Sequence, residues 1–308
     1  MKLNRREFIG GVAATAATGC ISKKMVETDL PENEEAFLDV WQREADLVKP
    51  EHYRLYMQTG DTQGLAALER LESSFERILR EIPETTVGDV PAIWHVYNMG
   101  VVVKTREALF SIDLNHRRAT ELAPKLDFAL ISHNHGDNYT QPFYQAMNGA
   151  GKTVVNNFID NYGAADWRKG GMYWKDGGYI RGVKVFHLKD VEIRTSLTDH
   201  NQYLVDYTTA FEIRVGGWRM LHSGDCSNVG KLNPVWGRPD LWIQMPGCGC
   251  DNVAGEKKLR PKLTAFCHVN EMGHGPGRVT ADFLRPRLAK VRAAGGTVVV
   301  PRWGDRIV

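Results

Sequence analysis

Apolar and polar residues near the start of the chain alternate with the spacing of amphipathic helices. Within residues 31–83, apolar side chains recur three and four positions apart, and acidic residues come early. The stretch QGLAALERLESSFERILREI has no glycine between Leu65 and Ile82. This pattern predicts two or three helices over residues 31–83. We expect them to lie against the outside of a main domain or near the mouth of its cleft.

From Ala92 onward the pattern changes to short apolar runs of the strand type, separated by turns rich in Gly, Asn and Asp. The runs are AIWHVYN, VVVKT, ALFSIDL, FALISH, KTVVNN, VKVFHL, VEIRTSL, AFEIRV, WRMLHSG, LWIQMP, LTAFCH and TVVVP. Helices are expected among them at 140–148 and 280–293. Strands far outnumber helices, so the predicted class is mixed α/β or α+β, not a doubly wound dinucleotide-binding fold.

The first twenty residues, MKLNRREFIGGVAATAATGC, have the pattern of a secretory signal that is too short to span a membrane as a helix. Arg5 and Arg6 resemble the pair of a twin-arginine export signal, and the segment ending at Cys20 resembles a lipoprotein cleavage box. We expect an exported protein, periplasmic or held at the cell envelope by a lipid on Cys20. An ordinary signal with a chance arginine pair is the alternative.

Length and charge narrow the classes of partner. A chain of 308 residues with 43% hydrophobic residues is long enough for one large domain or two modest ones. Without residues 1–19, 36 basic and 36 acidic residues remain. A net charge near zero gives no electrostatic footprint for nucleic acid, so we expect a small-molecule or lipid-like substrate. The sequence does not indicate an oligomeric state.

Ligand-type side chains follow one apolar run at every second position. In ISHNHGDNYT, the strand-like run ends at Ser132, and His133, His135 and Asp137 follow. Side chains two apart in extended chain point to the same side, so the two histidines can converge on one ion. Thr140 and Pro142 then signal the start of a helix.

Three further ligand-type residues stand where other apolar runs end. They are His200 in SLTDHN, Asp225 in MLHSGDCS and His268 in TAFCHVNEMGH. Loop histidines are often only solvated, but the ends of strands are where a sheet protein collects groups from distant parts of its sequence. The recurrence therefore favours a metal site.

The order of these residues resembles that of the metallo-β-lactamase superfamily, whose ligands run H-x-H-x-D-H, then His, Asp and His. Within it, AIWHVYNMGVVVKTREALFSIDL is similar to the opening hairpin of the branch that contains ascorbate 6-phosphate lactonase and N-acyl phosphatidylethanolamine phospholipase D. The resemblance implies a four-layer αββα sandwich of two mixed sheets over residues 90–308. Residues 21–89 would then be an N-terminal helical extension, and residues 1–20 the signal.

The resemblance also implies a set of metal ligands and their roles. His133, His135 and His200 would hold the first ion, Asp225 would bridge, and Asp137 with His268 would hold the second. The expected cofactors are one or two divalent ions, zinc first and manganese or iron as alternatives. Asp137, Asp225 and His274 are the expected catalytic residues.

Asn138 stands where the superfamily motif has its fourth histidine. An amide oxygen is a neutral and weak ligand, so the second position would favour a harder ion such as Mn²⁺ or stand empty. Two other interpretations remain open for Asn138. It could cap the following helix or orient Asp137 by a hydrogen bond.

Several other residues compete for a place in the site. His274 is an alternative to His268 as the last ligand, and Glu271 could orient either ring. The remaining histidines are interpreted as core or supporting residues (His95, His187, His222) or as solvated surface (His52, His116). Of the cysteines, Cys226 and Cys267 adjoin expected ligands, whereas Cys248 or Cys250 could line the cleft. Soft-metal binding by that last pair is a weaker possibility.

These residues favour a metal-dependent hydrolase that acts on a phosphodiester, lactone or amide through an activated water. Two alternatives remain. One is an oxygen-dependent oxidoreductase with mononuclear iron, and the other is a non-catalytic binding lipoprotein whose second metal position has degraded.

Overall fold

The computed structural model describes residues 33–156, 172–173, 179–180, 183–201, 204–273 and 278–308. It begins with three helices, α2 (Glu34–Asp46), α3 (Pro50–Thr59) and α4 (Ala66–Glu84). The side chain of Asn33 caps α2 by accepting from two backbone N–H groups, and α3 begins with a proline and ends at Gly60 in the left-handed conformation. The helices predicted over residues 31–83 are confirmed.

Two mixed sheets form the centre of the molecule. The first has the order β1-β2-β3-β4-β5, with β1 (Ala92–His95), β2 (Val101–Lys104), β3 (Leu109–Ile112), β4 (Phe128–Leu130) and β5 (Thr153–Val155). The second has the order β14-β13-β12-β11-β10-β9-β8, with β8 (Val185–Leu188), β9 (Val191–Thr198), β10 (Thr208–Val215), β11 (Trp218–His222), β12 (Leu241–Gln244), β13 (Leu263–Phe266) and β14 (Val298–Val299). Each sheet has an antiparallel half, β1 to β3 or β8 to β11, and a parallel half.

The sheets are held together by apolar side chains that point inward from every second position along the strands. Phe110 and Phe128 of the first sheet stack at 4.5 Å, and Phe211, Ile213 and Ile243 of the second sheet belong to the same buried cluster. Burial of such side chains stabilises a fold by roughly 1.5–3 kcal/mol each. This inter-sheet core fixes the two sheets against each other and so fixes the loops at their edge.

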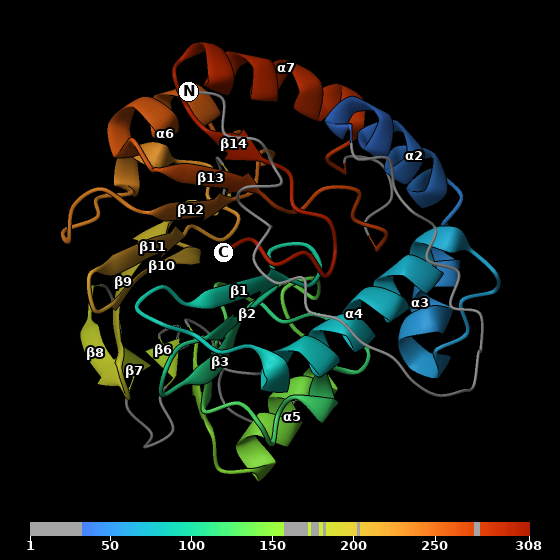
Figure 1. Ribbon diagram of the computed structural model, residues 1–308, viewed down its shortest axis with the longest axis horizontal. Helices are drawn as coiled ribbons and strands as arrows, with labels where there is room; N and C mark the ends of the chain where they lie inside the picture. Colours follow the sequence, from blue (N-terminus) through green and yellow to red (C-terminus); the bar gives the residue numbers. More distant parts are fainter. Residues whose placement is uncertain (1–32, 157–171, 174–178, 181–182, 202–203, 274–277) are drawn as a thin grey trace.

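Helices cover the outer faces of both sheets (Figure 1). α5 (Gln141–Gly149) and α4 lie beside the first sheet, and α6 (Asn252–Leu259) and α7 (Ala281–Ala293) beside the second. Two short 3₁₀ helices, η1 (Ala119–Glu121) and η4 (Val229–Lys231), lie in the connections between strands. The arrangement is the predicted αββα sandwich, and the two helices expected after the first sheet begins are present as α5 and α7.

The N-terminal helices pack on this sandwich through a large buried cluster. Trp41 of α2 meets Trp303 edge to face at 5.0 Å, and Leu71 and Phe75 of α4 are fully buried. Ion pairs join α2 to α7, since Arg285 contacts both Glu35 and Asp39. The extension therefore shares a core with the sheets.

Two short strands and the helix α6 are among the elements that were not predicted. β6 (Met172–Tyr173) and β7 (Tyr179–Ile180) form a separate pair too short to leave an apolar pattern. α6 has eight residues with a glycine at its centre, and that glycine sits against the ring of Trp242.

Within the described ranges, no helix is long and apolar enough to cross a membrane. The expected signal, residues 1–20, lies outside them.

Candidate metal centre

The loop after β4 is held in place by Asp113, a buried acceptor that directly follows the neighbouring strand β3. Ser132 donates its backbone N–H to Oδ1 of Asp113 at 2.7 Å, and its hydroxyl lies 2.9 Å from Nδ1 of His133. If that hydroxyl accepts from Nδ1–H, Nε2 of His133 is left free to bind an ion. The chain turn therefore aims the Nε2 atom of His133 into the cleft.

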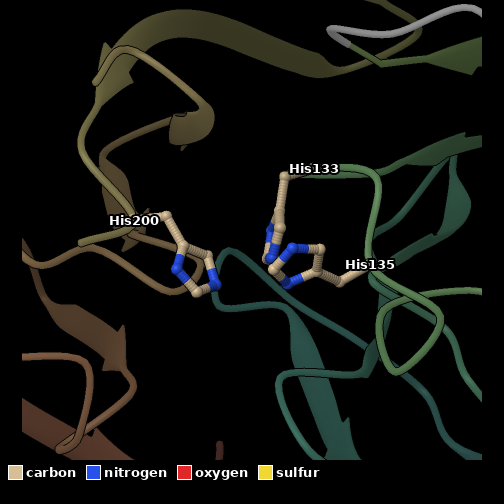
Figure 2. Close-up of side chains that lie close together, drawn as sticks. All are labelled: His133, His135 and His200. Atoms are coloured by element: carbon tan, nitrogen blue, oxygen red, sulfur yellow. The ribbon is translucent and has the colours of Figure 1, made fainter. Parts of the chain in front are cut away.

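His133, His135 and His200 form a first donor group (Figure 2). Their ring centroids are 4.6, 5.0 and 4.5 Å apart, and one ring nitrogen from each lies within 4.8 Å of the others. Figure 2 shows the rings facing one another across the gap between the loop after β4 and the loop after β9. Burial lowers the pKa of His133 to about 3, so its ring is neutral at pH 7, the form that binds a metal.

Asp137, Asp225 and His268 form a second donor group. Nε2 of His268 lies 2.9 Å from Oδ2 of Asp137. Although burial lowers it, the facing carboxylates of Asp225 and Asp137 raise the pKa of His268 to about 10. A proton therefore joins His268 and Asp137, and an ion binding here must displace it.

One carboxylate oxygen connects the two groups. Oδ2 of Asp225 lies 3.7 Å from Nε2 of His133, 3.6 Å from Nε2 of His200 and 3.7 Å from Nε2 of His268. Two ligands each about 2.1 Å from one tetrahedral ion are roughly 3.4 Å apart. The spacing around Asp225 is thus close to that of a carboxylate shared between two metal positions.

Whether an ion fits between the donor groups can be judged from buried polar atoms that lack hydrogen-bond partners. In the part of the chain that the structure describes, Oδ1 of Asp225 and Nε2 of His200 are buried and have no hydrogen-bond partner. A buried polar atom without a partner costs roughly 1–3 kcal/mol, more if charged. Both atoms belong to the donor groups, so a bound cation would satisfy them and the residues present fit it.

Asn138 contacts both donor groups. Its Nδ2 lies 3.2 Å from Oδ1 of Asp137 and 3.2 Å from Nε2 of His133. The alternative that Asn138 caps the next helix is wrong, because Thr140 caps α5 by accepting from the N–H of Phe143. The contact with Asp137 fits an orienting role.

Three supporting residues were missed in the sequence. Asn98 follows β1, donates to the carbonyl of Asp137 and accepts the N–H of His268 at 2.9 Å. Asn115, which follows β3 as Asp113 does, donates to the carbonyl of Gly136 at 2.8 Å. Asp113 follows β3 directly, and Asn98 and Asn115 stand three residues after the ends of β1 and β3, so a position soon after a strand was the available signal.

The backbone is strained near these groups. Asn98, Asp113 and His268 have positive φ angles of 50°, 48° and 61°. Such conformations cost of order 1–3 kcal/mol each for residues other than glycine, and they cluster at functional sites. Here they turn strand ends sharply so that the side chains face the cleft.

Cys248 and Tyr207 also border the first donor group. Sγ of Cys248 lies 3.8 Å from Nδ1 of His200, and its sulfur groups with His200 and Asp225 as a third set of donor atoms. The ring of Tyr207, which the sequence did not single out, lies 5.5–6.1 Å from the three histidine rings. Cys226, Cys248, Cys250 and Cys267 are free thiols. Cys248 thus lies beside the first donor group.

For the remaining histidines, the structure confirms some of the predicted environments and contradicts others. His95 and His222 are buried and bonded to the carbonyls of Asn98 and Met99, as expected of core residues. His187 was expected in the core, but its side chain is 68% exposed on β8. His116 was expected at the surface, but it is fully buried against Phe75 because α4 covers it. His274 lies outside the described residues.

A cavity of about 710 Å³ adjoins the donor groups. One wall is the loop that carries the predicted motif, including Asn134, His135 and Asp137, and the start of α5. Residues of helix α3 also line the cavity, together with Glu271 and Gly273. The metal-ligand motif therefore opens onto a space large enough for a small organic molecule.

Comparisons with protein-family models and with curated proteins find no match. Solved structures do match in fold. A metallo hydrolase from Ignicoccus hospitalis is 18% identical, with a TM-score of 0.50 over 70% of this chain and 97% of its own. The metallo-β-lactamase fold protein YhfI from Bacillus subtilis is 16% identical, with a TM-score of 0.51 over 68% of this chain and 91% of its own. The chain thus has the metallo-β-lactamase fold.

A further match is CmlA, a diiron β-hydroxylase from Streptomyces venezuelae. It is 15% identical, with a TM-score of 0.51 over 82% of this chain. The chain spans 58% of the length of CmlA. At these identities the likeness concerns the fold alone.

Proposed function

We propose that the protein is a metal-dependent hydrolase. The observation that carries the proposal is the position of Asp225, whose Oδ2 lies 3.6–3.7 Å from three imidazole nitrogens of two donor groups. His133, His135 and His200 would hold the first ion, and Asp137 with His268 the second. Asp225 would be shared.

A bound ion would supply a nucleophile at neutral pH, by lowering the pKa of a water from 15.7 to about 7, and would polarise the bond to be cut. The chain's own groups would then orient and move protons. Asp225 would accept a hydrogen bond from the water and orient it toward the substrate. Asp137, whose Oδ1 lies 3.2 Å from Nδ2 of Asn138, would take the proton that the water loses.

We propose zinc as the resident metal. Three imidazoles suit zinc, and the Cys248 sulfur beside His200 makes the surroundings softer than manganese prefers. Asn138 adds no strong donor to the second group, which gives that position lower affinity than the first. Manganese or iron at the second position is the alternative.

The proposed substrates are phosphodiesters, lactones or amides of small-molecule or lipid-like size. The cavity of about 710 Å³ fits a small organic molecule, and its wall of helix, loop and ligand-bearing turn brings such a molecule next to His135 and Asp137. His274 remains a candidate for proton transfer from the segment beside Gly273.

The test is a panel of a nitrophenyl phosphodiester, an aromatic lactone and a nitroanilide with the zinc-loaded protein. We expect turnover of at least one, loss of that turnover on chelation, and its return with added Zn²⁺. Zinc at full occupancy with no turnover across an extended panel would contradict the hydrolase and favour the binding lipoprotein.

A second candidate is an oxygen-dependent oxidoreductase with iron. The likeness to the diiron enzyme CmlA and the carboxylate shared between two donor groups favour it. Iron in protein isolated from its own compartment, together with oxygen consumption, would support this candidate over the hydrolase.

We further propose that the chain is exported and lipid-anchored at Cys20, on the strength of the RR pair and the segment ATGC. Mass spectrometry of the mature protein tests this. An N-terminal diacylglyceryl Cys20 is the expected result, and an unmodified Cys20 would contradict the anchor.

A further inference from the structure

One face of helix α3 forms a wall of the cavity at the candidate metal centre. The residues of α3 that line it are Pro50, Tyr53, Arg54 and Met57. They stand at positions i, i+3, i+4 and i+7, which place four side chains on one side of a helix. The helix belongs to the N-terminal extension, whereas the facing wall carries the ligand motif.

Packing on its other sides fixes α3 in this position. Tyr56 is fully buried and donates its hydroxyl proton to Glu72 of α4 at 2.8 Å. Tyr53 stacks on Tyr97, which follows β1, with ring centroids 5.7 Å apart. Helix α3 is therefore anchored both to α4 and to the segment that follows β1.

Among the described residues, those that line the cavity include charged side chains of both signs, two acidic and one basic. The acidic residues that line it are Asp137 and Glu271. Arg54 is the one arginine or lysine that lines the cavity, within the portion of the chain described. Among the residues that the structure describes, the exposed side chain of Arg54 has no ion-pair or hydrogen-bond partner, whereas Arg70 of α4 pairs with Glu44 at 2.8 Å. A guanidinium left without an internal partner at a cavity wall is suited to an anionic ligand.

The rest of the helix face is apolar. Met57 and the ring of Tyr53 flank Arg54, and Tyr139 lines the cavity from the loop opposite. A ligand that reaches Arg54 from the metal centre would thus pass over apolar side chains.

We propose that α3 is a substrate-recognition element and that Arg54 binds a carboxylate or phosphate group of the substrate remote from the bond that is cut. This inference rests on the proposed function, because it assumes that the reacting group sits at the metal centre. The substrate class it defines is an anionic molecule with an apolar middle section. Arg54 is a specificity residue here and takes no part in bond cleavage.

Calorimetric titration with unreactive bifunctional acids tests the proposal without turnover. The full-length zinc-loaded protein is titrated with succinate, adipate, suberate and sebacate, and with the monocarboxylate of the same chain length in each case. One carboxylate can occupy the metal centre, so a second one at the matching length reports on Arg54. Phosphonocarboxylates of the same lengths show whether phosphate or carboxylate is preferred.

We expect one chain length to bind about tenfold more tightly than its monocarboxylate, the value of one charge-assisted contact of roughly 1.4 kcal/mol. Arg54→Gln should abolish that gain and leave the monocarboxylate unchanged, while Arg54→Lys should keep part of it. Arg43→Gln, an exposed arginine of α2 outside the cavity, is the matched control and should behave as wild type.

The proposal is overturned if no diacid binds more tightly than its monoacid, or if Arg54→Gln weakens both equally. Failure of the hydrolase proposal would look different. In that case no substrate turns over, but the diacid gain and its loss in Arg54→Gln would still be measured.

Discussion

Two buried clusters of histidine and acidic side chains lie near helix α3, and they differ in how their polar atoms are satisfied. In the first, His116 stacks on Phe75 at 4.0 Å, accepts the N–H of Arg118 at Nδ1, and has Nε2 3.1 Å from the hydroxyl of Tyr56. That hydroxyl donates to Glu72, so Nε2 carries the proton and the ring is neutral. Both ring nitrogens are used.

The second cluster, the candidate metal centre, leaves polar atoms without partners. Oδ1 of Asp225, Nε2 of His200 and Oδ1 of Asn138 are buried and make no hydrogen bond to any residue that the structure describes. Both clusters combine similar residue types with similar burial. The difference teaches that completed hydrogen bonding marks a structural cluster, whereas converging atoms that lack partners mark a place for a ligand.

Removing one histidine from each cluster tests whether the first is structural and the second binds metal, and it should give the largest effect. His133→Ala should lower activity by about a thousandfold or more, because the loss of one ligand of three forfeits several kcal/mol of metal-derived catalysis. Zinc content should fall, while the thermal midpoint of the apo protein changes little. Assays of activity, bound zinc and thermal unfolding check this.

His116→Ala is the matched variant. It should lower the thermal midpoint and leave zinc content and activity per folded molecule unchanged. If His116→Ala removed zinc, or His133→Ala kept full activity, the distinction between the two clusters would be wrong.

The next largest effect is expected at Glu72. Arg117 and Arg118 both pair with its carboxylate, at 2.6 and 3.0 Å, and Tyr56 donates to it. Glu72→Gln removes the charge from these partners and should destabilise the fold by roughly 2 kcal/mol, about thirtyfold in the unfolding constant. Urea unfolding measures this, with exposed Glu69→Gln of the same helix as the control. Equal midpoints for both variants would contradict the expectation.

A smaller effect concerns pH. Burial lowers the pKa of His116 to about 3, against about 6.5 in an unfolded chain. Below pH 6.5 the unfolded state therefore binds a proton that the folded state does not, and stability falls as the pH drops from 6.5 toward 3. One such group contributes up to about 1.4 kcal/mol per pH unit.

Unfolding of wild type and His116→Gln at pH 5 to 7 isolates this contribution, since the other buried histidines act equally in both. The variant should show the shallower slope. His187→Gln, on the surface of β8, should keep the slope of wild type. Identical slopes in wild type and His116→Gln would show that His116 does not contribute to the pH dependence of stability.

The two clusters also show what a sequence can reveal. Residues placed directly after apolar runs, His133, His200, Asp225 and His268, could be predicted to meet, because strand ends in one sandwich share an edge. His116 could not be placed, because its burial depends on α4 crossing from a distant part of the chain. The same long-range packing brings Arg54 to the cavity.

Strands and helices could be predicted because their periodicities are local properties, whereas the four layers followed from the resemblance to the metallo-β-lactamase superfamily. The order of strands within each sheet was not predicted, and neither was the pairing of Asn98 with the loop of Asp137. Both depend on contacts that no local pattern encodes. Conversely, the departure at Asn138 was visible in the sequence, but only the structure shows which neighbours its amide meets.

The smallest predicted effect concerns Asn138 and compares the two metal positions within the metal centre. Asn138 lies 3.2 Å from Asp137 and from Nε2 of His133, so an imidazole at this position would add a donor between the two groups. Asn138→His should raise the affinity for a second zinc about tenfold, because imidazole is a better donor than an amide for a borderline ion. The first zinc should be unaffected.

Zinc titration with a chromophoric chelator measures both binding steps, and Asn138→Ala is the control that removes the amide without adding a donor. Asn138→Ala should change the rate by only a few fold if the amide orients Asp137 without binding metal. The hydrolase needs only the first ion for a basal rate, since three imidazoles and an open position are the set a catalytic zinc requires. Wild type should therefore already be active. A wild type that turns over nothing, beside an Asn138→His variant that gains hydrolysis, would identify the native protein as a binding relic of the fold.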